Sequence, residues 1–238
     1  MISSTADPRA GLRRYGYSFV PGALFIVDPT LSAEMKELTK EWENLPPDPY
    51  VPLPRTRFRR YSRYLFDPKT SELSHKPNEI YIQRREFNPL YGGLPRVFAP
   101  LTSAFVDGTF LRSLIRYNID QLPLGDDAAL DIHVHAVRIR AEGGSVGEPS
   151  PEGTHRDGFA FVTVHMFRFF NAVGGHSAVE DSSHSVKTNV RLESPLDTLF
   201  IDDRILLHKT SAISQNDISS GPAVRDVLLM SIDYAATI

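Results

Sequence analysis

The chain has 238 residues, a length that fits one domain and allows a sizeable buried core. Hydrophobic residues make up 41% and charged residues 23%, close to ordinary globular usage, and the net charge of −3 excludes a broad electrostatic grip on nucleic acid or an acidic membrane. Cysteine is absent, which excludes disulfides, thiolate metal sites and cysteine nucleophiles and fits a cytoplasmic protein. We expect no signal peptide and no membrane-spanning segment.

The first part of the chain mixes helices, strands and loops. Apolar residues at helical spacing predict one helix, and Asp28 or Thr30 could cap its start. The expected elements, in chain order, are a loose polar segment over 1–12, a strand over 15–20, a helix over 31–45, a proline-rich loop over 46–54, a strand over 80–87, a turn over 88–93 and a helix over 97–119 that breaks near Asp107.

After about residue 128, short apolar runs alternate with clusters of Gly, Pro, Asp and Asn. This texture predicts strands over 130–140, 155–170, 176–180, 185–191, 197–202, 204–209 and 224–234. Short strands at such spacing are typical of a β-sandwich or jelly roll rather than of a βαβ fold. We therefore expect a single domain over 1–238, in which a mixed helical part over 1–128 packs on a jelly-roll core over 129–238.

The segment that indicates chemistry is Thr154-His155-Arg156-Asp157-Gly158. In an extended chain, residues two apart point to the same face, so the side chains of His155 and Asp157 can converge. His208, which directly follows the apolar run 205–207, can supply a third ligand. Two histidines and one carboxylate form the facial triad of non-haem Fe(II) sites, and three coordination positions stay free for a 2-oxo acid and dioxygen.

A 2-oxo acid with a second carboxylate also needs a cation. Arg225 opens the strand over 224–234, and an arginine there can make a bidentate contact with a carboxylate. The alternative is an ion pair between Arg225 and Asp226 or another acid.

Several motifs of the chain, taken together, resemble one enzyme family. They are Asn88-x-x-Tyr91-Gly92-Gly93-x-x-Arg96-x-Phe98, Thr154-His155-Arg156-Asp157-Gly158-Phe159, Gly174-Gly175-His176-Ser177, Leu199 to His208 and Arg225-Asp226-Val227-Leu228. From about residue 55 onward, the chain resembles Fe(II)/2-oxoglutarate dioxygenases of the bacterial L-isoleucine 4-hydroxylase type.

The resemblance implies a mainly β fold with flanking N-terminal helices, in which a cupin-like jelly roll, the double-stranded β-helix, forms the core. It implies hydroxylation of a C–H bond of a free, aliphatic L-amino acid, with Fe(II), 2-oxoglutarate and O2 as cofactors, ascorbate as a stimulant, and succinate and CO2 as coproducts. Carried over to this sequence, it makes His155, Asp157 and His208 the iron ligands and Arg225 the 2-oxoglutarate anchor.

Other residues are candidates for the substrate pocket. Arg168 lies among aromatic residues, and if buried it needs a carboxylate from 2-oxoglutarate, the substrate or a structural acid. The segment Arg55–Arg63 holds five arginines, which could bind nucleic acid, hold a carboxylate or lie exposed on an edge strand. His133 and His135 could form a second metal pair. The more ordinary interpretations are that one side chain faces inward and the other outward, or that both are satisfied by hydrogen bonds. His165 could face the pocket or the core, and Asp202-Asp203 predicts a turn.

Three functions are consistent with these motifs. The first is hydroxylation of a small free amino acid, in a protein without a nucleic-acid or membrane partner that could form a homo-oligomer. The second is the same iron chemistry on a peptide, nucleobase or carrier-bound substrate, which the Arg55–Arg63 segment would favour. The third is a cupin-like metal protein that does not use 2-oxoglutarate and has no need of Arg225.

Overall fold

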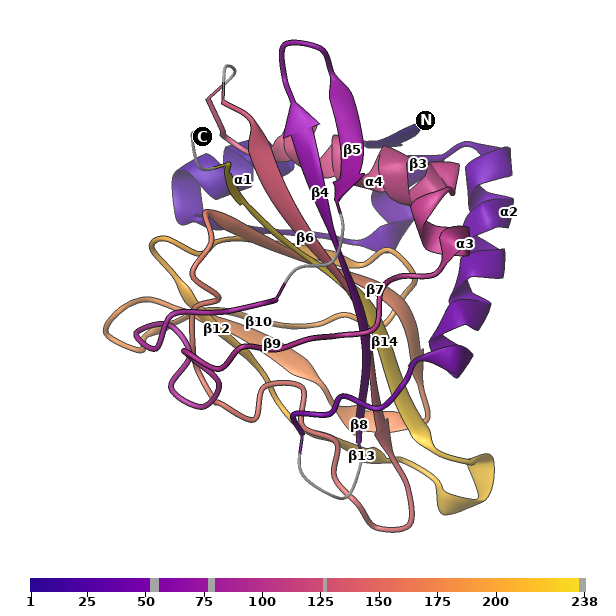
Figure 1. Cartoon of the computed structure of the whole chain (residues 1–238). Helices are drawn as coiled ribbons and strands as arrows, with labels where there is room; N and C mark the ends of the chain where they lie inside the picture. The colour runs from indigo at the N-terminus through magenta and orange to yellow at the C-terminus, as the bar shows by residue number, and fades with distance from the viewer. Residues whose placement is uncertain (52–55, 77–79, 126–127, 236–238) are drawn as a thin grey trace.

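A seven-stranded antiparallel sheet forms the centre of the computed structural model, which describes residues 1–51, 56–76, 80–125 and 128–235 (Figure 1). The strand order is β2-β11-β7-β14-β6-β4-β5. The bounds in that order are Tyr17–Val20, Thr198–Asp202, Phe161–Phe170, Ala223–Tyr234, Leu130–Ala141, Arg57–Asp67 and Glu72–Lys76. The first part of the chain therefore does more than pack on the core, since it supplies β2, β4 and β5 to the large sheet.

A smaller sheet lies opposite part of the large one. It has the order β10-β9-β12, with bounds Val186–Arg191, His176–Glu180 and Leu207–Thr210. Two short ribbons extend the strand set: β13-β8, over Ile213–Gln215 and Ala172–Gly174, and β1-β3, over Ile2–Ser4 and Phe25–Val27. The predicted mainly β class with a jelly-roll core is confirmed.

Helices cover the outer face of the large sheet (Figure 1). The α-helices are α1, α2, α3 and α4, over Pro8–Tyr15, Pro29–Leu38, Ser103–Val106 and Thr109–Gln121. Short 3₁₀ helices cover Gly22–Leu24 (η1), Thr39–Asn44 (η2) and Ile218–Ser220 (η3). The Asp28 carboxylate caps α2 by accepting from the Thr30 N–H at 2.9 Å, and Pro29 begins the helix, where its missing donor costs nothing.

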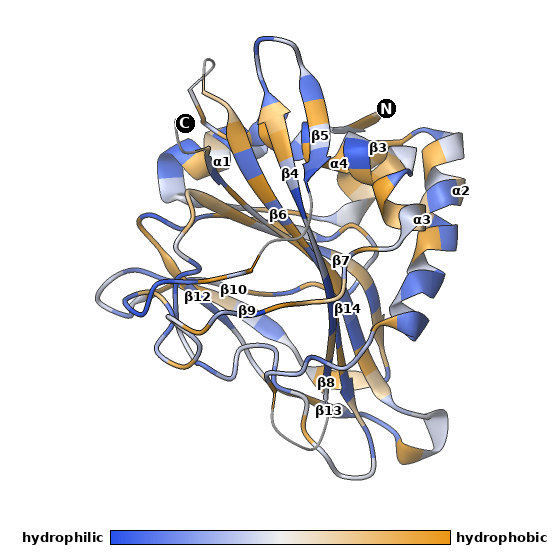
Figure 2. Cartoon of the chain, in the orientation of Figure 1, coloured by the Kyte–Doolittle hydropathy of each residue, from blue (hydrophilic) through white to orange (hydrophobic). Residues whose placement is uncertain are grey.

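Hydrophobic and hydrophilic residues alternate along much of β6 (Figure 2), and buried apolar clusters lie on both faces of this strand. Ile132, Val134 and Ala136 point toward the helices and join one buried cluster, which includes Leu111 and Leu114 of α4. The residues between them and beyond point toward the smaller sheet, where Val137, Ile139 and Ala141 join a second buried cluster. Because side chains alternate along a strand, the large sheet packs on helices with one face and lines the space between the two sheets with the other.

Most expected elements are confirmed, with shifted ends. Four differ. The segment 1–12 is ordered as β1 and α1, and 80–87 is a series of turns with one isolated bridge between Tyr81 and Arg96. The helix over 97–119 starts only at Ser103 and does break after Val106. The strand over 155–170 starts only at Phe161. Arg55 and the last residues of the loop 46–54 lie outside the described residues.

Within the part of the chain that the structure describes, no helix combines the length and the apolar character that crossing a bilayer requires.

Candidate metal centre

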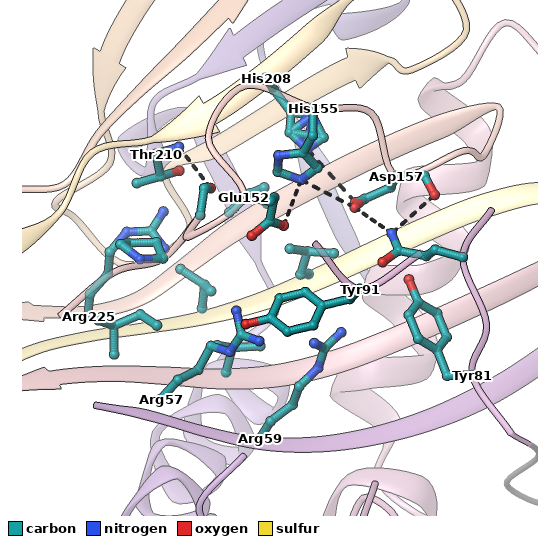
Figure 3. Close-up of a pocket in the computed structure, with 18 of the residues that line it drawn as sticks. Arg57, Arg59, Tyr81, Tyr91, Glu152, His155, Asp157, His208, Thr210 and Arg225 are labelled. Carbon is teal, nitrogen blue, oxygen red and sulfur yellow. Dashed lines mark hydrogen bonds and ion pairs between the residues drawn. The ribbon is translucent and has the colours of Figure 1, made fainter. Parts of the chain in front are cut away.

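Three side chains that can hold a metal ion converge between the two sheets (Figure 3). His155, Asp157 and His208 each offer a ligand atom, and these three atoms lie within 4.8 Å of one another. His155 precedes β7, and His208 lies on β12. The His155 N–H donates to the His208 carbonyl at 3.0 Å, and the His208 N–H donates to the His155 carbonyl at 2.9 Å. This isolated bridge fixes the two histidines side by side.

The turn after Asp157 depends on Gly158 and Asp203. Gly158 has φ +87°, and a Cβ atom there would lie 2.4 Å from the Phe87 ring, so the position requires glycine. The buried Asp203 carboxylate accepts from the backbone N–H groups of Asp157, Gly158 and Phe159 at 3.1, 2.7 and 3.1 Å. These three hydrogen bonds hold the chain in the conformation that turns the Asp157 side chain toward the histidines.

A buried amide orients the Asp157 carboxylate. The Gln83 Nε2 group donates to Asp157 Oδ1 at 3.0 Å and to the Asp157 carbonyl at 3.1 Å. The Gln83 Oε1 atom accepts from Asn88 and Arg96, so the amide cannot flip without losing both contacts. Gln83 therefore leaves Asp157 free to offer its other oxygen to a ligand.

The hydrogen bonds select one ring nitrogen of His155 for a metal. Its Nδ1 atom lies 2.9 Å from the Gly153 carbonyl, which can only accept, so Nδ1 carries the proton and Nε2 is left to ligate. Nε2 lies 3.5 Å from Asp157 Oδ1. Burial lowers the pKa of His155, but the Asp157 hydrogen bond and charge outweigh burial and raise the pKa to about 9.

The other two side chains of the triad respond to the same contacts. Burial raises the pKa of Asp157, yet the His155 hydrogen bond and charge hold it at about 2. Burial and the His155 charge lower the pKa of His208 to about 4. An anionic carboxylate between two imidazoles is the donor set of a non-haem Fe(II) site, and iron binding at His155 would displace a proton. The residues fit the metal by donor chemistry and by their convergence.

Arg225 lies in the same pocket as the triad (Figure 3). Its side chain is buried, and its Nε and Nη2 atoms have no hydrogen-bond partner among the described residues. Burial lowers the pKa of Arg225 to about 10, which still leaves the guanidinium protonated at neutral pH. Asp226 points to the other face of the sheet and is held there by Arg138 at 2.7 Å. The alternative of an Arg225–Asp226 ion pair is therefore wrong, and a buried cation is left facing the pocket.

Arg168 lies elsewhere. Its guanidinium is 44% exposed and forms an ion pair with Glu43 at 3.0 Å, beside Arg138 and on the helix-covered side. Of the three partners considered for it, the structure supplies the structural acid. The expectation that Arg168 binds 2-oxoglutarate is corrected, because β7 has a register shift at Phe167, between the pairs Val227–Met166 and Asp226–Arg168, which interrupts the alternation and turns this side chain away from the space between the sheets.

The arginines of β4 divide between the pocket and the surface. Arg57 and Arg59 stand two apart and both line the pocket, whereas Arg63 forms an ion pair with Asp131 at 2.7 Å. β5 pairs with β4 only from Arg63 onward, but the Arg57 and Arg59 side chains are largely buried, so the alternative of exposed arginines on an edge strand is wrong for these two. The inward arginines match instead the alternative in which one or two of them hold a carboxylate.

The remaining histidine candidates are not part of the metal centre. His133 and His135 share the inner face of β6, as residues two apart must, and both are hydrogen-bonded: His133 to Tyr61 at 2.7 Å and His135 to Arg59 at 3.1 Å. The inward-and-outward reading is wrong, and within the described ranges the pair forms no second metal cluster. His165 lies in the core, because the irregular segment before β7 shifts the face register and Val164 lines the pocket instead.

Comparison with known proteins decides the family. A family model described as 2OG-Fe dioxygenase matches residues 39–231, which include the whole triad and Arg225. The chain belongs to the 2-oxoglutarate–Fe(II) dioxygenase family. Its cofactors are therefore Fe(II), 2-oxoglutarate and O2, and the cupin-like alternative that does not use 2-oxoglutarate is overturned.

Two characterised relatives match this dioxygenase over nearly its whole length. The 3(1)-hydroxy-L-isoleucine 4-dioxygenase of Pantoea ananatis (strain AJ13355) is 30% identical over 92% of both chains. The L-isoleucine-4-hydroxylase of Bacillus thuringiensis is 24% identical over 93% of this chain and 92% of its own.

Two solved structures share the fold of this dioxygenase. The structure of IDO from Bacillus thuringiensis superposes with a TM-score of 0.81 at 20% identity, and 96% of this chain and 98% of that chain are covered. The structure of a bsmA homolog from Methylobium petroleophilum PM1 also gives 0.81, at 25% identity and with coverage of 97% and 94%.

Reasoning from sequence missed several residues of the dioxygenase pocket. Those not singled out were Gln83, Tyr81, Pro149, Ser150, Glu152 and Thr210, and Asp203 was read only as part of a turn. Pro149, Ser150 and Glu152 were covered only collectively, because the Gly- and Pro-rich loop over 141–153 leads into the His155 motif and indicates a rim over a site. Gln83 lies in a series of turns, where the sequence has no hydrophobic periodicity that would predict which way the side chain points.

Proposed function

We propose that this dioxygenase hydroxylates an unactivated C–H bond of a small free L-amino acid with an aliphatic side chain. In this proposal His155, Asp157 and His208 hold Fe(II), and Arg225 binds the far carboxylate of 2-oxoglutarate. With the cosubstrate and O2, the iron supplies the oxidation that hydroxylates the C–H bond and forms succinate and CO2. The chain's own groups bind, orient and exclude water.

One observation carries the cosubstrate part of the proposal. Arg225 is a buried guanidinium in the pocket that the triad lines, and two of its nitrogens have no hydrogen-bond partner within the described ranges. A buried charge without a partner is costly, and a bidentate carboxylate contact would compensate it. Thr210 lines the same part of the pocket and can add a hydroxyl donor.

The aliphatic part rests on the pocket wall next to the triad. Five side chains from β6, β7 and β14 provide an apolar surface there: Val137, Ile139, Val164, Val227 and Leu229. Such a surface binds a hydrocarbon side chain without leaving a polar group unpaired. The names of the two relatives give L-isoleucine and 3(1)-hydroxy-L-isoleucine as substrates, and the second carries a hydroxyl group on the same branched carbon chain.

A peptide, nucleobase or carrier-bound substrate is the second candidate, and the structure gives it less support. The arginines that could have formed an outer basic surface include Arg57 and Arg59, which point inward. A nucleic-acid partner is therefore not part of the proposal. A cytoplasmic location is part of it, because 2-oxoglutarate and free amino acids are intracellular metabolites.

The test is succinate formation from 2-oxoglutarate with Fe(II) and ascorbate across a panel of free L-amino acids, with mass spectrometry of every reaction. The proposal expects a product heavier by one oxygen, formed together with succinate, for an aliphatic amino acid. Succinate without a modified amino acid would contradict the substrate class and direct the search to larger substrates.

A further inference from the structure

Glu152 is a buried carboxylate that no role proposed so far uses. It lines the pocket next to the triad, and its side chain is only 9% exposed (Figure 3). One oxygen, Oε1, lies 3.3 Å from His155 Nε2. The other, Oε2, has no hydrogen-bond partner among the described residues.

Among the described residues, the ion pair with His155 is the only polar contact of the Glu152 carboxylate, and iron binding removes it. His155 Nδ1 is occupied by the Gly153 carbonyl, so Nε2 is the nitrogen left for the metal. A ligating Nε2 has neither a proton nor a lone pair to offer Glu152. Glu152 does not belong to the set of ligand atoms that lie within 4.8 Å of one another. In the iron-loaded enzyme its carboxylate therefore needs another cationic partner, because a buried charge is stable only when paired.

The opposite wall of the pocket carries an excess of positive charge. Arg57 donates through Nε to Asp48 at 2.8 Å, but its Nη2 atom is buried and has no hydrogen-bond partner in the described part of the chain. Arg59 lies 4.0 Å from the same Asp48 carboxylate. Two guanidinium groups thus share one buried acid, which leaves positive charge facing the pocket.

The two walls are close enough to act on one small molecule. Figure 3 shows the Tyr91 ring between Glu152 on one side and Arg57 on the other. Burial raises the pKa of the Tyr91 phenol, the Arg57 charge lowers it and the Glu152 charge raises it, so both charges act on this phenol. In the large sheet, Arg57, Ile139 and Arg225 are direct neighbours across β4, β6 and β14. Strand spacing therefore separates Arg57 from Arg225 by about 10 Å, which leaves room for two carboxylates side by side.

We propose that Glu152 accepts the α-ammonium of the substrate while Arg57, supported by Arg59, binds its α-carboxylate, so that the pocket selects a free zwitterionic α-amino acid. This inference rests on the proposed function and adds the residues that bind the ammonium and the carboxylate of the substrate. It gives a physical reason for rejecting peptides and carrier-bound residues, since an amide bond removes one of the two charges.

The test measures binding separately from turnover. Enzyme loaded with Mn(II) and 2-oxoglutarate is titrated by calorimetry with L-isoleucine, N-acetyl-L-isoleucine and L-isoleucinamide. For wild type we expect L-isoleucine to bind best. In Glu152→Gln, which keeps size and shape, we expect the affinity for L-isoleucine to fall about 10- to 100-fold and the preference over the N-acetyl form to shrink. Glu148→Gln, an exposed acid on the same loop, is the matched control and should behave as wild type.

Arg57→Lys tests the other end of the substrate. Lysine keeps a positive charge for Asp48 but loses the planar fork. We expect the preference for L-isoleucine over L-isoleucinamide to shrink, with the preference over the N-acetyl form unchanged. Arg60→Lys lies on the same strand outside the pocket and serves as control. Thermal unfolding of each variant verifies that it is folded.

Two results would overturn the inference. If Glu152→Gln kept the wild-type preferences while L-isoleucine still bound, the ammonium would be read elsewhere and the proposed function would stand. If Glu152→Gln instead weakened Mn(II) binding at unchanged substrate preference, Glu152 would be a fourth metal ligand. Wild-type enzyme that bound and modified none of the free amino acids would contradict the proposed function itself.

Discussion

His155 and His208 face each other across a two-residue antiparallel bridge, with their ring centroids 4.6 Å apart. The bridge joins the irregular segment before β7 to β12, two parts of the chain 53 residues apart. The position of each imidazole is thus set by backbone hydrogen bonds rather than by side-chain packing alone. A metal site built in this way is preorganised, because its ligands are held before the ion arrives.

The first prediction concerns the triad. We expect His155→Ala and Asp157→Ala to abolish turnover and Mn(II) binding, because each removes one of the three ligands. Calorimetry measures the metal affinity, and circular dichroism verifies that the variants are folded. His184→Ala, an exposed histidine, should retain both properties. Full activity in either triad variant would refute the assignment.

The second prediction concerns the cosubstrate. We expect Arg225→Gln to raise the dissociation constant of 2-oxoglutarate by about 10- to 100-fold, since a charged hydrogen-bonded contact is lost. Metal affinity should not change. Arg168→Gln is the control, because its partner Glu43 lies outside the pocket. An unchanged 2-oxoglutarate affinity in Arg225→Gln would move the anchor to Arg57 or Arg59.

A third prediction follows from the same buried cation. Two nitrogens of Arg225 find no hydrogen-bond partner among the residues that the structure describes, so its burial opposes folding when no cosubstrate is bound. We expect Arg225→Met to raise the free energy of unfolding of the cosubstrate-free protein by about 1–2 kcal/mol, in the direction seen when buried charges are replaced by apolar groups. Urea unfolding with and without 2-oxoglutarate measures it. Destabilisation of the cosubstrate-free variant would show that the cation has a structural partner.

The fourth prediction concerns Asp203, whose carboxylate holds the turn after Asp157 and whose Oδ1 atom lies 3.8 Å from His208 Nδ1. Its carboxylate accepts three backbone N–H groups, and an asparagine would place a donor against some of them. We expect Asp203→Asn to weaken Mn(II) binding by about 10- to 100-fold. Asp202→Asn, next to it but paired with Arg204, should leave metal affinity unchanged. Equal metal affinities in the two variants would contradict this role.

The fifth prediction concerns pH and His165. Its Nε2 atom accepts from Asn118 at 2.9 Å, and its Nδ1 atom faces Thr198 Oγ1 at 2.8 Å. The Thr198 hydroxyl hydrogen is used on the Leu196 carbonyl, so Nδ1–H donates and the neutral ring is fully paired. Burial lowers the pKa of His165 to about 3.

The direction of the pH dependence of stability follows from the protonation of His165 in the folded and the unfolded chain. Below its ordinary pKa of 6.5, His165 takes up a proton in the unfolded chain but stays neutral in the folded one, so stability falls as pH falls toward 3. We expect a contribution of about 2 kcal/mol lost between pH 7 and pH 5. Urea unfolding of wild type and His165→Gln at both pH values measures it, and the variant should show the smaller loss. Parallel pH profiles would contradict the prediction. His176→Gln, at an exposed position, is the control.

The sequence alone predicted that His155, Asp157 and His208 converge, and it singled out Arg225, which lines the same pocket. His155 and Asp157 were predictable as a pair because their spacing and their glycine-flanked setting are local properties of the chain. The strands over 130–140, 176–180 and 224–234 were predictable because apolar alternation reflects one buried face. Arg225 was predictable because it opens such a strand after the last histidine.

Only the tertiary structure decided which arginines face the pocket. Arg168 and Arg225 both lie on central strands near aromatic or apolar residues, and a one-residue change in register reverses which of them points inward. In β7 the register shift at Phe167 turns Arg168 away from the pocket. The positive φ of Gly158 interrupts the extended segment before β7, which places His165 in the core. Gln83, Glu152 and Asp203 come from turns and loops without periodicity, and their convergence depends on long-range contacts that no local pattern encodes.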